Sequence, residues 1–348
     1  MTARARSRGS HPLRPSAGQG RRDMPAEAPV APQWPSYRGP SQFVGTSPSQ
    51  RVTVYADPSL GAPGLQNAQD LVNDADRIAS ANDALFGTVG GQVSVIVFAL
   101  GSRTDGTGGA DHMGCDYTTG NAIEVCASFG NSARVAALFV AELSECSMGG
   151  DLCGVSTGEA LSRWCAAVIG HNALPDFATA PQWAQDGMPN FVDTTDPTDQ
   201  NPDSTGCGMA FLSWLMSQGH GLDQIAPAMV ALRDAGTLAQ LYRNQTSDLA
   251  SNAWPSFQAA VQQLPNAITS DDPFGALAQP AQLVHQSLWT LALASKVFSS
   301  ILADIASGKS AAQIVAGVRA LLPTTKFVHD PLIGRSESRR LVPPHKAR

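Results

Sequence analysis

The sequence has little charge and few aromatic side chains, and both shortages limit the partners of the chain. Charged residues make up 15% and aromatic residues 6% of its 348 residues, whereas hydrophobic residues reach 43%, enough for a sizeable core. The formal net charge is -6 and the pI is near 5.6, and the sequence shows no basic patch interleaved with aromatics. These features predict that nucleic acid is not a partner.

Several motifs that would mark an enzyme or a membrane protein are also missing. The sequence contains no P-loop, no Gly-rich dinucleotide fingerprint that opens a helix, and no G-x-S-x-G elbow. The most apolar stretch, residues 282–308, is interrupted by His285, Lys296 and Asp304. It therefore lacks the uncharged run of roughly 20 residues that a membrane span needs, and we expect no transmembrane span.

Cysteine is absent outside residues 115–207, where six cysteines cluster without any C-x-x-C spacing. An even, clustered count predicts disulfides and an oxidising compartment rather than a zinc knuckle or a redox motif. The first residues show no apolar secretory h-region, so the cysteines alone carry the expectation of an extracellular or secreted protein, and the alternative is a protein that stays inside the cell with free thiols. Among the many connectivities open to six cysteines, we predict pairing of sequence neighbours: Cys115–Cys126, Cys146–Cys153 and Cys165–Cys207.

Hydrophobic patterning predicts an α+β fold in which strands precede most of the helices. Alternating or continuous β-branched runs predict strands at 51–59, 92–100 and 121–129, with a Gly-rich loop at 101–120. Apolar residues at helical spacing predict helices at 64–87, 131–149, 158–170, 180–192, 207–219, 221–247 and 251–265.

Composition divides the chain into four parts. Residues 1–45 are rich in Arg, Pro and Gly and are predicted to form a disordered tail, followed by the main domain at 46–275. A helical segment is predicted at 276–325 and a basic disordered tail at 326–348.

The helix predicted over Asn131–Gly149 carries the strongest chemical signal. Glu142 and Glu145 are three residues apart, so their carboxylates share one face of the helix. With Glu159 they form a candidate catalytic set, because neighbouring like charges raise a carboxyl pKa and favour proton transfer. The alternative is a structural ion network in which Arg163 and the start of the next helix neutralise the acids.

Two loops supply further candidates. In the Gly-rich loop, Asp111 and His112 would face a ligand, unless the glycines serve only a disulfide-held turn. The acidic loop at 193–206 lacks the glycine and glutamate spacing of an EF-hand, which favours a solvated turn over a calcium loop. Its aspartates are Asp193, Asp196, Asp199 and Asp203.

The order strand, helix, strand, edge strand, helix resembles the zincin metallopeptidase fold, with 121–129 as the edge strand. The HExxH motif of the gluzincin branch aligns with residues 141–145, AELSE, and its W-x-x-E-G-x-A-x-[FY] motif aligns with 183–191. Residues 207–219 resemble a helix of plant basic secretory proteins. Residues 139–274 resemble an uncharacterised bacterial secreted family with ELSE, GE-x-LSR, GC-x-x-x-FL and DDPF motifs. The resemblance implies a small mixed sheet and a central active-site-type helix, followed by a mainly helical half.

The chain departs from the zincin motif at the metal ligands. Ala141 cannot bind a metal, Glu145 replaces the second histidine, and Asp186 takes the third-ligand position. Glu142 keeps the position that the resemblance assigns to the general base. Because zinc prefers nitrogen and sulfur ligands, we expect no zinc site and no resident cofactor, although carboxylates would suit a hard cation such as calcium.

Two functions follow from these departures. The favoured expectation is a secreted metallopeptidase-like protein that has lost its zinc site and acts as a non-catalytic binding or scaffold module. Its ligand would be an extracellular molecule or peptide. The alternative is a zinc-free hydrolase of peptides or glycans that uses the clustered glutamates. The candidate ligand-binding residues are Asp111, His112, Arg163 and Asp186, and the candidate catalytic residues are Glu142, Glu145 and Glu159.

Overall fold

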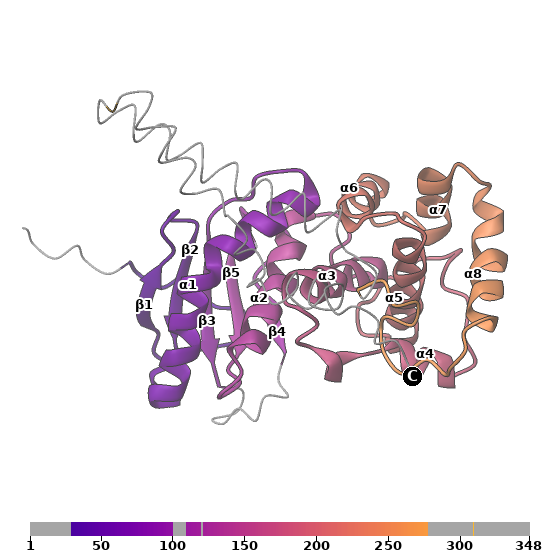
Figure 1. Ribbon diagram of the computed structural model, residues 1–348. Helices are drawn as coiled ribbons and strands as arrows, with labels where there is room; N and C mark the ends of the chain where they lie inside the picture. Colours follow the sequence, from indigo (N-terminus) through magenta and orange to yellow (C-terminus); the bar gives the residue numbers. More distant parts are fainter. Residues whose placement is uncertain (1–28, 100–108, 120, 278–308, 310–348) are drawn as a thin grey trace, which may run out of the picture. The chain divides into compact units, whose positions relative to one another are not determined.

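The computed structural model of the chain describes residues 29–99, 109–119, 121–277 and 309. Every helix and strand below lies in the compact unit that begins at Ala31. The unit combines one mixed sheet with eight α-helices among the described residues, which confirms the predicted α+β class (Figure 1).

The five strands form a sheet in the order β1-β2-β3-β5-β4. Their bounds are β1 Gln42–Thr46, β2 Val52–Ala56, β3 Val93–Phe98, β4 Ala110–His112 and β5 Ala122–Cys126. The three predicted strands are confirmed as β2, β3 and β5, which run parallel in the middle of the sheet. The antiparallel strands β1 and β4 form the two edges and were not predicted. Strand β5 is therefore interior, and the prediction that 121–129 forms the edge strand is wrong.

The helices follow the predicted order, with some boundaries shifted. Their bounds are α1 Gly61–Phe86, α2 Ser132–Ser147, α3 Ser156–Ile169, α4 Ala180–Gln185, α5 Pro202–Ser217, α6 Leu222–Leu232, α7 Leu238–Thr246 and α8 Ala253–Gln262. Helix α5 begins inside the predicted acidic loop, because Asn201 caps it and Pro202 suits a first helical position. The predicted helix 221–247 is divided into α6 and α7, where Arg233 has a positive φ of 61°.

Helix α2 forms where local sequence favours it. The side chain of Asn131 accepts a hydrogen bond from the Arg134 N–H at 3.1 Å, which satisfies one of the free donors of the first turn. The apolar run 136–140 is buried against the sheet and the neighbouring helices. The helix ends after Ser147, and Gly149 and Gly150 follow with φ of 69° and 91°, which favour glycine. The helix contacts β4, β5, α1 and α3.

The two faces of the sheet are covered in different ways. Alternate residues such as Val54, Val95 and Val125 pack into the main core with α1 and α2. The intervening residues, including Tyr55 and Ile96, form a second cluster on the opposite face.

That second face is covered by the chain ahead of β1. Trp34 is only 3% exposed and packs edge-on against Tyr55 with ring centroids 5.5 Å apart. Glu124 of β5 accepts hydrogen bonds from the backbone N–H groups of Ser36 at 3.0 Å and Tyr37 at 2.9 Å. Residues 34–37 thus pack on the sheet or hydrogen-bond to it, and residues 42–46 pair with it as β1. The predicted disordered tail over 1–45 is wrong for these residues, and residues 1–28 lie outside the described part of the chain.

The helical half has an aromatic core. The ring of Phe257 in α8 lies 5.8 Å from Trp183, 5.2 Å from Phe211 and 5.6 Å from Trp214, measured between centroids. These packed rings place Trp183, Phe211 and Trp214 in the core. The predicted segments 276–325 and 326–348 lie outside the described residues, apart from Ala276, Leu277 and Lys309. No helix in the described part of the chain is long and apolar enough to cross a bilayer.

Candidate functional site

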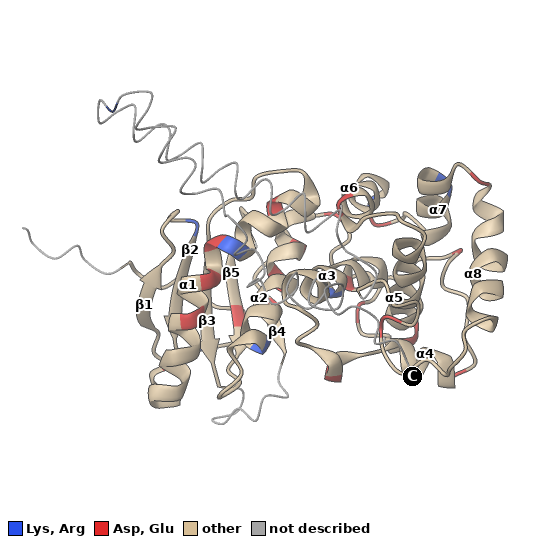
Figure 2. Ribbon diagram, viewed as in Figure 1, with Lys and Arg blue, Asp and Glu red and all other residues tan. Residues whose placement is uncertain are grey.

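A cavity of 440 Å³ is lined by residues of β4, α2 and α3, a volume within the roughly 300–1,000 Å³ typical of small-molecule sites. Its lining is strongly acidic, in keeping with how few Lys and Arg residues lie on the described ribbon (Figure 2). The basic side chains among the lining residues are Arg163 and His112. The acidic ones are Asp111, Glu142, Glu145, Glu159, Asp199, Asp271 and Asp272.

His112 and two glutamates converge on one wall of this cavity. His112 ends strand β4, and its Nε2 lies 2.8 Å from Glu145 Oε2 and 3.9 Å from Glu142 Oε2. One donor atom of each residue lies within 4.8 Å of the other two. Sequence reasoning selected all three residues but placed no histidine near the glutamates. That contact depends on the pairing of β4 with β5, which no local sequence pattern predicts.

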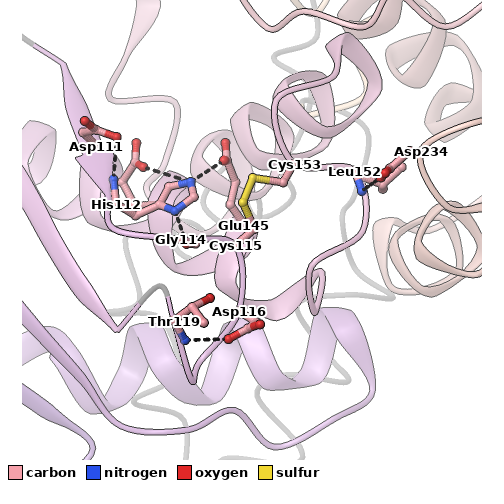
Figure 3. The surroundings of a disulfide bond; sticks show 11 residues. Asp111, His112, Gly114, Cys115, Asp116, Thr119, Glu145, Leu152, Cys153 and Asp234 are labelled. Atoms are coloured by element: carbon pink, nitrogen blue, oxygen red, sulfur yellow. Dashed lines mark hydrogen bonds and ion pairs between the residues drawn. A yellow bond between two sulfur atoms is a disulfide. The ribbon is translucent and has the colours of Figure 1, made fainter. Parts of the chain in front are cut away.

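Two hydrogen bonds fix the imidazole of His112. Its Nδ1–H donates to the backbone carbonyl of Gly114, and its Nε2 shares a hydrogen bond of 2.8 Å with the Glu145 carboxyl group (Figure 3). The Gly114 carbonyl can only accept, so Nδ1 carries a proton. Burial lowers the pKa of His112, but the hydrogen bond to Glu145, its charge and the Gly114 carbonyl together shift it upward.

Glu142 has a different environment from its neighbour. Its side chain is 12% exposed, and no described residue donates a hydrogen bond to its carboxylate, since the 3.9 Å separation from His112 is too long. Burial raises the pKa of Glu142 well above its ordinary value, and the nearby charges of Glu145 and Glu159 raise it further. A carboxyl group in these surroundings can bind a cation or transfer a proton.

Glu159 is neutralised within its own helix. Arg163, one turn later, places Nε 2.6 Å from Glu159 Oε1 and donates from Nη1 to the Phe177 carbonyl, also at 2.6 Å. Burial raises the pKa of Glu159 while Arg163 opposes the rise. Among the described residues, no ion pair joins Arg163 to Glu142 or Glu145. The predicted ion network through Arg163 is therefore wrong for the two glutamates of α2.

Asp186 does not share the site. Three of the four candidate ligand-binding residues line the cavity, and Asp186 is the exception. Helix α4 ends at Gln185, and Asp186 is its exposed C-cap, followed by Gly187 with a φ of 89°. The buried face of this short helix is taken by Ala180 and Trp183, which leaves Asp186 on the outside.

A loop residue of the DDPF motif completes the cavity wall. Asp271 accepts hydrogen bonds from the backbone N–H groups of Thr179 at 2.8 Å and Ala180 at 2.7 Å, at the start of α4. Burial raises the pKa of this carboxyl, and the two backbone hydrogen bonds partly offset the rise. Sequence reasoning recognised the motif but assigned it no role.

The disulfide connectivity differs from the predicted one. Cys115 is bonded to Cys153, with Cα atoms 5.8 Å apart, so the predicted disulfides Cys115–Cys126 and Cys146–Cys153 are both wrong. Cys126 instead packs in the cluster on the opposite face of the sheet. The disulfide connects the segment that follows His112 to the turn between α2 and α3. This bond is consistent with the expected oxidising compartment.

The remaining predicted disulfide, Cys165–Cys207, is also wrong. Cys165 and Cys207 are buried thiols, and burial raises the pKa of each to about 12.

The donor chemistry of the site is distinctive. In the described part of the chain, His112, Glu142 and Glu145 are the one group of three convergent His, Cys, Asp or Glu side chains that could hold a metal ion. The aspartates of the acidic loop form no such group among the described residues, and Asp193 and Asp196 accept hydrogen bonds from Asn190 and Asn201. No protein-family model matches the chain, and no curated protein is significantly similar to it in sequence.

Proposed function

We propose that the chain is a zincin-like binding module, exported to an oxidising compartment, whose cavity holds a cationic ligand. One observation carries the proposal: the cavity combines seven acidic side chains with Arg163 and His112 as its basic groups. Arg163 is already paired with Glu159, so an entering cation meets uncompensated carboxylates. A partly enclosed site strengthens such attraction, because water screens it less than at the surface.

The zincin-like scaffold is supported by the placement of the site. The helix that aligns with the metallopeptidase motif, α2, lies against the antiparallel edge strand β4, and both line the cavity. The motif position Ala141 lines the same cavity, where its methyl group cannot act as a ligand. The module would thus keep the cleft of the resembled fold without that fold's donor set.

A thermal-shift panel tests the proposal. The cations are Zn²⁺, Mn²⁺, Ca²⁺ and N-acetylarginine amide, and the anionic controls are sulfate and N-acetylglutamate amide. A cation at about 100 times its Kd should raise the Tm by about 5 °C or more, and Glu145→Gln should abolish the rise. The proposal fails if no cation stabilises the protein, or if the anions stabilise it as well as the cations do.

A second candidate function rests on the geometry of Glu142. Its carboxyl group faces the cavity without a hydrogen bond from any described residue, beside the His112–Glu145 pair. Such a group could transfer protons in the hydrolysis of a peptide or glycan. Incubation with a mixed peptide library and a panel of oligosaccharides, followed by mass spectrometry, would detect cleavage. Cleavage at the full rate by Glu142→Gln would eliminate this candidate.

A further inference from the structure

A strand and a helix together supply one nitrogen and two oxygen donors to a single point of the cavity. We propose that His112, Glu142 and Glu145 form a binding site for a divalent first-row transition-metal ion such as Zn²⁺. The inference rests on the proposed function, because it names the cation that the acidic cavity takes. It differs from the site implied by sequence resemblance, which would need residues 141 and 186 and has no place for His112.

The distances suit a metal after small side-chain movements. Metal–donor bonds of about 2.1 Å in a tetrahedral site separate the donors by about 3.4 Å. The Nε2 of His112 lies 2.8 Å from the Glu145 oxygen and 3.9 Å from the Glu142 oxygen, values on either side of that separation. Neither carboxylate has to cross the cavity, so torsions of flexible glutamate side chains are sufficient.

The imidazole is already oriented for coordination. Its Nδ1–H is bound to the carbonyl of Gly114, the kind of support that fixes the ring and directs the other nitrogen at a metal. The disulfide at Cys115 and the antiparallel pairing of β4 hold this segment in place. The ion would bind both Nε2 and the Glu145 carboxylate in place of their mutual hydrogen bond, and the proton of that bond would be released to solvent.

The two cavity-facing glutamates differ from Glu159 in what neutralises them. Glu159 has the guanidinium of Arg163 at 2.6 Å. Glu142 and Glu145 share one imidazole neighbour, His112, and only Glu145 is within hydrogen-bonding distance of it. Their side chains are 12% and 14% exposed, so water reaches them only in part. A divalent cation would neutralise both carboxylates at once.

The donor set selects the class of ion. Calcium takes six to eight oxygen ligands and magnesium keeps several waters around a few carboxylates, whereas imidazole suits zinc, iron, nickel and copper. Three protein donors leave at least one coordination position open towards the 440 Å³ cavity, where water or a ligand atom can bind.

Equilibrium dialysis with Zn²⁺ and absorption spectroscopy with Co²⁺ test the site on the whole chain. We expect one tightly bound Zn²⁺ per chain and Co²⁺ absorption bands of low-coordinate geometry with nitrogen and oxygen donors. His112→Gln and Glu145→Gln should each weaken Zn²⁺ binding by more than about 100-fold, because loss of a direct ligand exceeds the effect of an outer-shell partner. The matched controls are His220→Gln, a histidine outside the cavity, and Asp199→Asn, a cavity carboxylate outside the trio. His220→Gln should bind Zn²⁺ as the wild type does, whereas Asp199→Asn should lose far less affinity than Glu145→Gln, because it removes a cavity charge but no ligand.

The outcomes separate this inference from the proposed function. Binding of Ca²⁺ or N-acetylarginine amide without Zn²⁺ or Co²⁺ binding overturns the metal site and leaves the cationic-ligand proposal standing. Failure of every cation overturns both. Undiminished Zn²⁺ binding by His112→Gln, or equal losses in Asp199→Asn and Glu145→Gln, would show diffuse attraction instead of a site. Circular dichroism confirms that each variant is folded, and the wild-type Co²⁺ spectrum remains decisive if a variant is not.

Discussion

A buried glutamate and a half-buried one, on opposite sides of the sheet, differ in what satisfies their carboxyl groups. Glu124 on β5 is 2% exposed and accepts hydrogen bonds from the Ser36 hydroxyl and the backbone N–H groups of Ser36 and Tyr37. Glu142 on α2 faces the cavity and accepts none from the described residues. Burial of a carboxylate is costly unless partners compensate it. Glu124 has its hydrogen-bond partners within the chain, whereas Glu142 has none among the described residues, and we propose that a ligand supplies them.

The largest expected effect on the free energy of unfolding comes from removing the Cys115–Cys153 disulfide beside the cavity. Cys115 and Cys153 are 38 residues apart, and the chain-entropy model gives about 3–4 kcal/mol for closing such a loop. Replacing both with serine should lower the free energy of unfolding by about that amount in urea titrations. It should also release the segment that carries His112 and weaken cation binding. A loss below about 1 kcal/mol, with binding intact, would mean that strand pairing alone positions His112.

Glu124→Gln should destabilise the sheet by about 2–3 kcal/mol. The substitution keeps the shape but removes charge-assisted hydrogen bonds, and an amide NH₂ then faces N–H donors. Urea titration of the variant beside the wild type measures the loss. An unchanged free energy of unfolding would indicate that Trp34 packing, not Glu124, holds residues 31–41 on the sheet.

Glu142→Gln should change the free energy of unfolding by less than about 1 kcal/mol, and in the stabilising direction if at all. No described residue donates a hydrogen bond to this carboxyl group, and the substitution removes an acid whose charged form is disfavoured by burial and by the neighbouring Glu145. The same urea titration serves, with Glu124→Gln as the matched control. Destabilisation comparable to that of Glu124→Gln would mean that Glu142 is a structural residue.

The smallest effect is expected at the thiols of the helical core. Because the pKa values of Cys165 and Cys207 are raised to about 12, both are almost entirely protonated at pH 8, and both are buried. Iodoacetamide should label neither residue in the native protein and both in denaturant, as read by peptide mass spectrometry. Rapid native labelling of Cys165 would show that α3 opens, and that the cavity wall is less rigid than the sheet.

The sequence was most informative where local patterning decides the structure. Helix α2 is predictable from the Asn131 cap, the apolar run before Glu142 and the glycines after Ser147, all of which act within a few residues. The buried strands β2, β3 and β5 follow from their β-branched runs. The shared face of Glu142 and Glu145 follows from helix geometry alone.

The parts that could not be predicted depend on contacts distant in sequence. His112 meets Glu145 across 33 residues, through a three-residue strand too short to show alternation. Cys115 bonds Cys153 because β4 and the turn after α2 meet in space, which cysteine spacing does not reveal. Strand β1 lies in a Pro- and Ser-rich stretch that does not have the pattern of a strand. Its pairing with β2 is also interrupted by a bulge between Phe43 and Gly45.

The roles of the two glutamates are separated most directly by isothermal titration calorimetry with Zn²⁺. The titration compares the wild type, Glu124→Gln and Glu142→Gln, each kept folded at low temperature. We predict that Glu124→Gln binds Zn²⁺ with wild-type stoichiometry despite its lower stability, and that Glu142→Gln keeps its stability but loses binding by more than about 100-fold. Equal Zn²⁺ binding by all three proteins would contradict the claim that Glu142 binds a cation.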